Sequence, residues 1–130
     1  IMKRIIVCED DNRKFEGIEK TISRLFKEVE IKRVKYAKAA IIEIKENEDK
    51  YDYLIQDMQL PINSDSRIDI KGGIYVLGQL ERRNFNIKYC ICSSDNSSYK
   101  SMVENGYADV PFINYSSFQF SEDIKEFLES

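Results

Sequence analysis

The sequence contains no histidine and no tryptophan among its 130 residues. Without histidine, this chain cannot by itself form a Ser-His-Asp or Cys-His nucleophile system, a Cys₂His₂ zinc site or a two-histidine iron site. It also lacks the imidazole that carries protons near pH 7. Any chemistry of this chain therefore depends on carboxylates, hydroxyls, lysines or the three thiols of Cys8, Cys90 and Cys92.

Long apolar runs and an excess of positive charge are absent too. No apolar run approaches the ~20 residues that a membrane span needs, so we expect no membrane contact. Lys and Arg number 20 against 23 Asp and Glu, and the net charge of −3 argues against direct nucleic-acid binding through a broad basic face. An odd number of cysteines inside apolar segments indicates free thiols, and we expect a reducing, cytoplasmic environment.

Short apolar segments alternate with amphipathic ones along a chain of single-domain length. The apolar segments predict strands at residues 4–8, 30–36, 53–56, 88–92 and 110–114. The amphipathic segments predict helices at residues 15–25, 39–44, 73–83, 97–105 and 122–128. Asp11 or Asn12 can cap the first helix, and we expect Ser121 to cap the last. Such alternation implies an α/β fold with a doubly wound parallel sheet and helices on both faces.

Polar side chains follow three of the predicted strands, where ligand sites of such sheets lie. If the first and third strands are neighbours, three carboxylates converge there, and a hard divalent cation such as Mg²⁺ would relieve their repulsion. A carboxylate beside such an ion can act as a nucleophile toward a phosphoryl group, and a nearby hydroxyl can bond that group. Alternatively, the acids serve only as helix caps. The side chains are Glu9, Asp10 and Asp11, then Asp57, then Ser93 and Ser94.

Three segments at these strand ends resemble the signatures of response-regulator receiver domains. They are residues 7–12, 51–61 and 91–94, and the stretch 57–61 is fairly specific by itself. The similarity covers essentially the whole chain in order and spacing. It implies a single receiver domain over residues 1–130 without an effector domain. It also implies a flavodoxin-like (βα)₅ fold with strand order 2-1-3-4-5.

The resemblance implies roles for the acidic residues. Asp57 would accept a phosphoryl group from a phosphohistidine on a partner histidine kinase or histidine phosphotransfer protein. Glu9 and Asp10 match the acid pair that holds Mg²⁺ (or Mn²⁺), and Asp57 and the backbone carbonyl of Gln59 would complete the protein ligands. The protein would then be a phosphoacceptor of a two-component system or phosphorelay, and not an enzyme beyond self-catalysed phosphotransfer and autodephosphorylation.

The resemblance also implies roles for residues around the phosphoacceptor. Ser93 matches the switch hydroxyl, which moves toward the phosphoryl group in the active state. Gln59 and Asp95 fall at two variable positions that influence how fast the phosphoryl group hydrolyses. Phe112 is the nearest candidate for the switch aromatic, although packing in the core would explain it as well. Output is expected through contact with a downstream protein target.

The sequence departs from the family in two places. The lysine that the family carries at the end of strand five is missing, and Asn114 is the best match to its position. Lys71 is a further candidate to reach the site. The second departure is a polar insertion at about residues 62–72, which is either a tolerated surface loop or a lid or docking element beside Asp57.

Two other functions remain open. A pseudo-receiver would keep the fold as an interaction module with impaired or no phosphorylation, and the missing lysine favours this alternative. A small phosphatase or phosphotransferase would use Asp57 as a covalent nucleophile. That enzyme would need a second carboxylate two residues later, where the sequence has Gln59.

Overall fold

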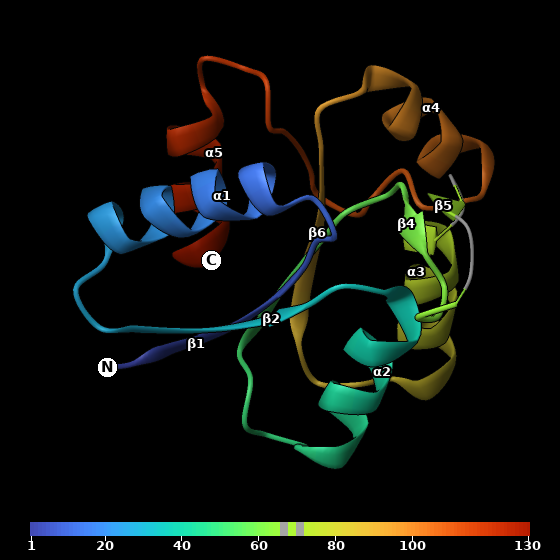
Figure 1. The fold of residues 1–130 in the computed structure, drawn as a ribbon, viewed down its shortest axis with the longest axis horizontal. Helices are drawn as coiled ribbons and strands as arrows, with labels where there is room; N and C mark the ends of the chain where they lie inside the picture. Colours follow the sequence, from blue (N-terminus) through green and yellow to red (C-terminus); the bar gives the residue numbers. More distant parts are fainter. Residues whose placement is uncertain (66–67, 70–71) are drawn as a thin grey trace.

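The computed structural model describes residues 1–65, 68–69 and 72–130. Within them, the main sheet has five parallel strands in the order β2-β1-β3-β6-β7 (Figure 1). Its strands are β1 (Lys3–Cys8), β2 (Val29–Val34), β3 (Tyr53–Gln56), β6 (Lys88–Ser93) and β7 (Phe112–Asn114). The helices are α1 (Asn12–Leu25), α2 (Ala37–Glu46), α3 (Gly72–Arg83), α4 (Asn96–Glu104) and α5 (Phe120–Leu128).

Counted along the chain, these five strands stand in the order 2-1-3-4-5, which confirms the predicted flavodoxin-like fold. The sheet positions the candidate residues because parallel neighbours end together. Cys8, the last residue of β1, pairs with Val34 of β2 and Gln56 of β3. Ser93 at the end of β6 pairs with Asn114 of β7. The polar residues that follow these strands therefore share one edge of the sheet.

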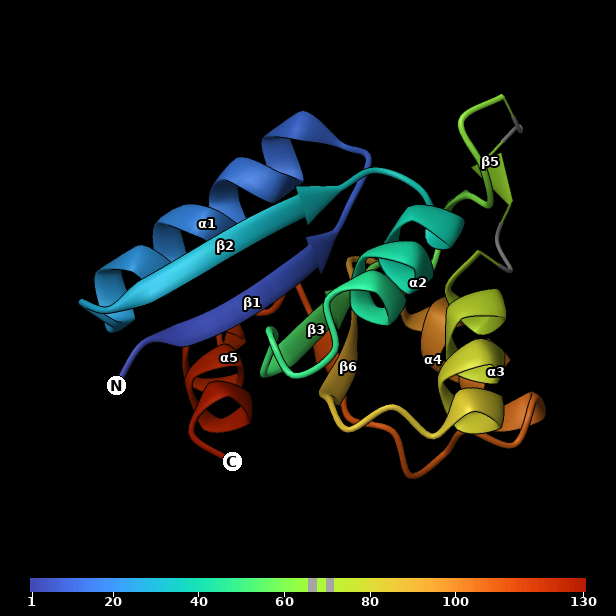
Figure 2. The ribbon, with the colours of Figure 1, turned by 90° about the horizontal axis from the view of Figure 1, so that it is seen from below.

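Helices cover both faces of the sheet (Figure 2). α1 and α5 pack on one face, where their apolar side chains meet alternate residues of the strands, such as Ile5, Ile55 and Cys90. α2 and α3 pack on the other face, against residues such as Ile6 and Leu54. α4 completes that second face through Met102, which joins a smaller cluster. Central strands buried on both faces explain their continuous apolar runs.

The three cysteines lie inside these layers. All three thiols are free and buried, as the sequence predicted. Burial raises the pKa of Cys8, Cys90 and Cys92, so the thiols stay protonated near neutral pH and act as small apolar side chains. Among the described residues, no helix is long and apolar enough to cross a membrane.

The structure corrects two local predictions. The second strand begins at Val29 and ends at Val34, slightly earlier than predicted. Ser121 does not cap α5, because this helix begins at Phe120 and its N-cap is Gln119. The Ser117 hydroxyl instead accepts the backbone N–H of Gln119 at 3.1 Å. Phe120 is buried against Tyr115, and this tertiary contact places the helix start two residues earlier than predicted.

Part of the predicted insertion at 62–72 pairs with the segment just before it. Leu60–Pro61 (β4) and Ile68–Asp69 (β5) pair as a short antiparallel ladder, which sequence patterning missed because each strand is too short for a periodicity. Lys71, named above as a candidate for the site, lies outside the described residues, as do residues 66–67 and 70. β4 directly follows the strand end that carries Asp57.

Candidate functional site

The junction between β1 and α1 holds the first acidic residues. Asp11 is the N-cap of α1, and its side chain accepts the backbone N–H of Lys14 at 2.8 Å. Glu9 is 2 % exposed and turns back into the site, where its Oε2 accepts the backbone N–H of Asp11 at 3.1 Å. The sequence allowed Asp11 or Asn12 as the N-cap, and the structure shows that the cap is Asp11. The side chains of Glu9 and Asp10 do not cap this helix and are available for other roles.

Asp57 is held from two sides at the end of β3. Its backbone N–H donates to the carbonyl of Cys8 at 3.0 Å, which continues the pairing of β3 with β1. Its side-chain Oδ1 accepts the backbone N–H of Met58 at 2.9 Å. Asp57 is 7 % exposed. A carboxylate fixed in this way has a defined orientation toward the edge of the sheet.

Glu9, Asp10 and Asp57 form one acidic cluster. Each offers a carboxylate oxygen, and these oxygens all lie within 4.8 Å of one another. Burial raises the pKa of Asp10, and the charges of Asp57 and Asp11 raise it further. Three oxygen donors at this spacing suit a hard divalent cation such as Mg²⁺, which prefers carboxylates and water. The cluster predicted from the strand ends is therefore present.

Lys14 also reaches this cluster, and the sequence analysis missed it. Its Nζ lies 2.8 Å from Oε1 of Glu9 and 2.9 Å from Oδ1 of Asp57. It also donates to the carbonyl of Cys92 at 2.9 Å. Burial lowers the pKa of Lys14, but the charges of Asp57 and Glu9 outweigh it and hold this pKa above its usual range. The sequence did contain a signal for this position: Lys14 lies four residues before the buried Ile18, so the two side chains share the helix face that packs against the sheet.

Burial also dominates the electrostatics of Glu9. It raises the pKa of this carboxyl group, and the ammonium of Lys14 opposes the shift. The nearby charge of Asp57 raises the Glu9 pKa further. Two buried carboxylates thus share one buried ammonium, and the site carries a net negative charge that a cation can neutralise.

Ser93, the predicted switch hydroxyl, is one of the hydroxyl residues that line the pocket. It is 3 % exposed, and its Oγ lies 3.0 Å from Oγ of Ser98 in the first turn of α4. The same oxygen accepts the backbone N–H of Asp95 at 3.2 Å. Ser93 is therefore tied to the start of α4, so that any movement of its hydroxyl toward Asp57 involves this helix.

Gln59 and Asp95 lie next to each other at the rim. Asp95 is the N-cap of α4 and accepts the backbone N–H of Ser97 at 2.9 Å. Hydrogen bonds from Ser97 and from the side chain of Gln59 hold the pKa of the Asp95 carboxyl below its usual range. The two positions that were predicted to tune hydrolysis thus contact each other above Asp57.

Asn114 and Phe112 occupy β7, beside these groups. The Asn114 side chain donates to Oδ1 of Asn96 at 3.0 Å and accepts the backbone N–H of Ser116 at 2.8 Å. Both of its polar atoms are thus engaged toward α4 and the following turn. The Phe112 ring packs edge-on against Tyr99 of α4, with ring centroids 5.5 Å apart.

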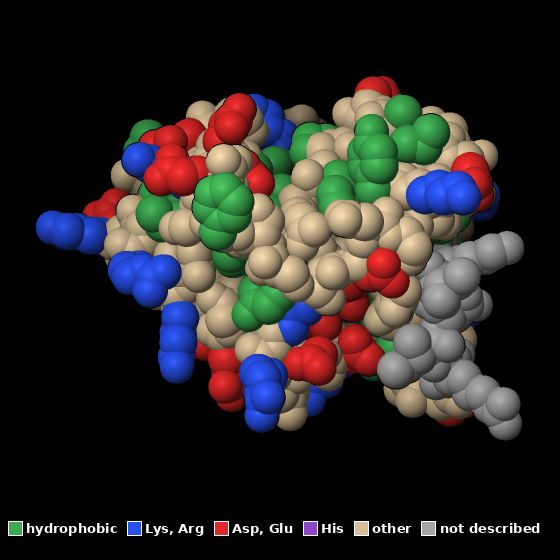
Figure 3. Space-filling view, turned by 90° about the horizontal axis from the view of Figure 1, so that it is seen from above, with side chains coloured by type: hydrophobic (Ala, Val, Ile, Leu, Met, Phe, Trp, Pro, Cys, Tyr) green, Lys and Arg blue, Asp and Glu red, His purple; other side chains and the backbone are tan. Residues whose placement is uncertain are grey.

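The acidic cluster opens into a surface pocket. Figure 3 shows acidic side chains gathered near the centre of one face, with basic side chains at their edge. The pocket is lined by Glu9, Asp10, Asp11, Arg13, Lys14, Asp57, Gln59, Ser93, Ser94, Asp95, Tyr115 and Ser116. Seven of the eight residues named from the resemblance are in the pocket or beside it. Phe112 is the exception and lies on the outer side of β7, against α4.

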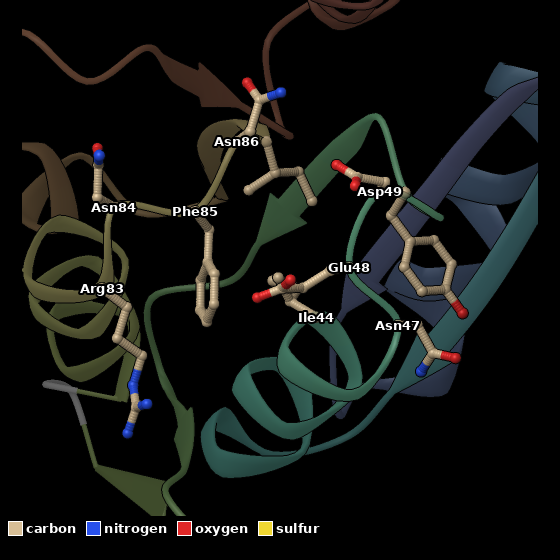
Figure 4. Close-up of a pocket in the computed structure, with 10 residues that line it drawn as sticks. Ile44, Asn47, Glu48, Asp49, Arg83, Asn84, Phe85 and Asn86 are labelled. Carbon is tan, nitrogen blue, oxygen red and sulfur yellow. The ribbon is translucent and has the colours of Figure 1, made fainter.

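A second hollow lies at the opposite edge of the sheet. Its lining comes mainly from the loops that follow α2 and α3, with Asn47, Glu48, Arg83 and Phe85 among the residues drawn in Figure 4. The lining side chains combine amides, two aromatic rings and charges of both signs, and no cluster of metal-ligating residues is found there among the described residues. The chemistry of the molecule is therefore assigned to the pocket around Asp57.

Comparison with known proteins identifies the fold. No family model matches the sequence, and no curated protein matches it either. A response-regulator receiver domain from Clostridium thermocellum aligns with a TM-score of 0.71 at 14% identity, covering 98% of this chain and 92% of that one. The receiver domain of the response regulator NarL from Mycobacterium tuberculosis gives 0.71 at 16% identity, covering 99% and 98%.

The structure is also similar to that of a longer protein, the response regulator RcsB of Salmonella typhimurium. The two align with a TM-score of 0.71 and 14% identity over 96% of this chain. This chain spans 57% of the length of RcsB. Together, these structures show that the chain has the fold of a response-regulator receiver domain, as the sequence motifs indicated.

Proposed function

We propose that this chain is a single signal-transduction receiver domain that accepts a phosphoryl group on Asp57. The observation that carries the proposal is the position of Asp57 itself. It is an oriented carboxylate at the end of a central strand, within one pocket that also holds the acids Glu9 and Asp10, the ammonium of Lys14 and the hydroxyl of Ser93. Groups of these kinds are what a transferring phosphoryl group needs around it.

The physiological donor would be a phosphohistidine on a histidine kinase or a histidine phosphotransfer protein, since this sequence has no histidine that could serve. In the transfer, an oxygen of Asp57 forms a bond to phosphorus while the P–N bond of the donor breaks. The electron pair of that bond stays on the imidazole nitrogen. Because the other ring nitrogen of the donor carries a proton, the imidazole leaves as a neutral group, and the products are an acyl phosphate on Asp57 and a neutral histidine on the donor.

The surrounding residues would stabilise the added charge. Both hydrogen bonds that the structure gives to the Asp57 side chain in the described residues go to Oδ1, so we assign Oδ2 as the nucleophile. Mg²⁺ or Mn²⁺, held by Glu9, Asp10, Asp57 and the Gln59 carbonyl, would neutralise phosphoryl oxygens. Ser93 would donate its O–H to the phosphoryl group after leaving Ser98. Gln59 and Asp95 would control the access of water and hence autodephosphorylation.

Output would pass to a downstream protein through the surface next to Ser93. Tyr99 and Val103 of α4 are 46% and 43% exposed, and apolar side chains are visible over this helix in Figure 3. The Phe112 ring packs against Tyr99, so a shift of Ser93 and α4 would also change the position of this aromatic pair. Exposed aromatic side chains of this kind are common in protein contacts. The protein would therefore signal by contact and not by turnover.

The test is phosphorylation by a small donor. The chain is incubated with acetyl phosphate and Mg²⁺, and the intact mass is measured. We expect one phosphoryl adduct that is lost in Asp57→Asn and kept in Asp109→Asn, an exposed acid elsewhere on the surface. An unmodified wild-type chain, or an equal adduct on Asp57→Asn, would overturn the proposal.

A second candidate is a pseudo-receiver, favoured by the neutral Asn114 and its engagement by Asn96. This module would keep the fold and bind partners without phosphorylation. Beryllium fluoride, a mimic of an acyl phosphate, separates the two functions when added with Mg²⁺. Large amide shifts around Asp57 and Ser93 in an NMR spectrum favour the phosphoacceptor, whereas an unchanged spectrum favours the pseudo-receiver.

A further inference from the structure

The ammonium of Lys14 occupies the centre of the acidic cluster. It contacts Glu9 Oε1 at 2.8 Å and Asp57 Oδ1 at 2.9 Å, which are two of the three carboxylates that could ligate a divalent ion. The Lys14 side chain is 11% exposed, and those of Glu9 and Asp57 are 2% and 9% exposed. This bridge is therefore mostly shielded from solvent.

We propose that Lys14 is the resident counter-cation of the Glu9–Asp57 pair, and that a divalent cation binds only by displacing its ammonium from these carboxylates. The inference rests on the proposed function for the identity of the cation. Lys14 belongs to helix α1, so it would perform from the first helix what the family assigns to a lysine at the end of strand five.

Electrostatics explains why the two cations compete. Attraction between a carboxylate and an ammonium at about 3 Å is strong where water is largely excluded. A divalent ion on the same carboxylates would place its charge within a few ångströms of the ammonium and repel it. Since Glu9 and Asp57 each offer an oxygen to both cations, occupancy by one weakens binding of the other.

An aromatic ring lies beside the bridging ammonium. In the bridged position, Lys14 Nζ already lies 5.9 Å from the centroid of the Tyr115 ring, a distance at which a cation is attracted to an aromatic face. Tyr115 is placed there because residue 17 is glycine, and a Cβ at Gly17 would meet the Tyr115 hydroxyl. Tyr115 and Lys14 both line the pocket mouth. An ammonium displaced from the carboxylates toward this ring would remain at the pocket mouth, where it would face phosphoryl oxygens on Asp57.

The experiment measures Mn²⁺ affinity by water-proton relaxation in the full chain without any phosphodonor. The variants are Lys14→Met, which removes the charge, Lys14→Arg, which keeps it, and Lys20→Met, which removes an exposed charge from the same helix. We expect Lys14→Met to bind Mn²⁺ about tenfold more tightly than the wild type, because a competing cation is gone. We expect the affinity of Lys14→Arg and Lys20→Met to stay within about twofold of the wild type.

A second readout needs no variant. The ¹⁵N signal of the Lys14 ammonium should shift when the wild-type chain is saturated with Mg²⁺. Equal or weaker Mn²⁺ binding by Lys14→Met, or an unmoved ammonium signal at saturating Mg²⁺, would overturn the proposal. The acetyl phosphate assay on the wild type separates the two failures, because an adduct on Asp57 leaves the proposed function standing even where the competition is refuted.

Discussion

The hydroxyl of Ser93 lies 3.0 Å from the hydroxyl of Ser98, and both side chains are buried. This contact links the end of a central strand to the first turn of α4. In the proposed mechanism, Ser93 leaves this partner to bond the phosphoryl group, so the contact opposes the active arrangement.

Replacement of each serine tests that relationship. Ser93→Ala removes the hydrogen-bond donor to the phosphoryl group. We expect it to slow adduct formation by about tenfold, because this is the rate change that corresponds to the free energy of one hydrogen bond to a charged group. Ser98→Ala removes only the competing partner, so adduct formation should match or exceed the wild-type rate. The rates are measured by intact mass with acetyl phosphate and Mg²⁺. Equal losses in both variants would contradict the separate roles.

Two glycines of α3 should respond in opposite ways to alanine. A Cβ at Gly73 would lie 2.7 Å from Met58 Cα and 2.8 Å from the Asp57 carbonyl oxygen, so backbone would have to move. We expect Gly73→Ala to lower the free energy of unfolding by about 1–3 kcal/mol. A Cβ at Gly78 meets only the Tyr107 hydroxyl, at 3.5 Å. Gly78→Ala should raise stability by about 0.5–1 kcal/mol through helix propensity. Urea denaturation measures both, and a stable Gly73→Ala would refute the close approach.

Asn114 offers a comparison with Lys14. The strand position matches the lysine of the family, but the Asn114 side chain is bonded to Asn96 and Ser116. We therefore expect Asn114→Ala to change the rate of adduct formation by less than about threefold, whereas Lys14→Met should slow it by about tenfold or more. Both rates come from the acetyl phosphate assay. A larger loss in Asn114→Ala would return the phosphoryl-binding role to β7.

At the opposite end of the sheet, the pair of Arg4 and Asp52 should make the free energy of unfolding depend on pH. Arg4 donates to Asp52 through its backbone N–H at 3.0 Å and through its guanidinium, with NH2 to Oδ1 at 3.2 Å. Burial raises the pKa of Asp52, but these bonds and the charge of Arg4 outweigh it and leave the pKa below its usual value. A carboxyl group whose pKa falls on folding stabilises the protein above its unfolded pKa, about 3.9, and loses this effect as pH falls through the folded value.

Asp52→Asn should therefore cost up to about 1 kcal/mol at neutral pH, a modest value because both side chains are more than a third exposed. The difference between wild type and variant should shrink as pH falls below about 4. Urea denaturation at several pH values measures it. A difference that is constant down to pH values near 2 would contradict this assignment.

Much of the fold was predictable because it is determined by local patterns. Continuous apolar runs such as the one ending at Cys8 indicate strands buried on both faces, and the alternation of strands and helices permits few topologies. The strand ends then follow, so the gathering of Glu9, Asp10 and Asp57 at one edge could be predicted from residue order. Asp57 and Ser93 were also marked by their resemblance to known motifs.

Other features depend on contacts between distant residues. The β4–β5 ladder is too short to show a periodicity, and the start of α5 depends on the packing of Phe120 against Tyr115. The partnership of Ser93 with Ser98 requires the actual direction of α4. None of these contacts follows from the hydrophobic pattern of the sequence. That pattern predicts which face of a helix or strand is buried, but not which residues of other elements that face contacts.

By itself, the sequence determined the class of fold and the acidic edge. Under the proposed function, it also requires that the phosphohistidine lie outside this sequence, which contains no histidine. Only the tertiary structure showed which cation of the chain contacts these carboxylates. Lys14 and Asp57 are 43 residues apart in the chain, yet their side chains lie 2.9 Å apart. This contact arises because the packing of α1 against the sheet turns its first turn toward the carboxyl ends of β1 and β3. The helical spacing of Lys14 and Ile18 indicates which face of α1 is buried, but not which strand ends that face meets.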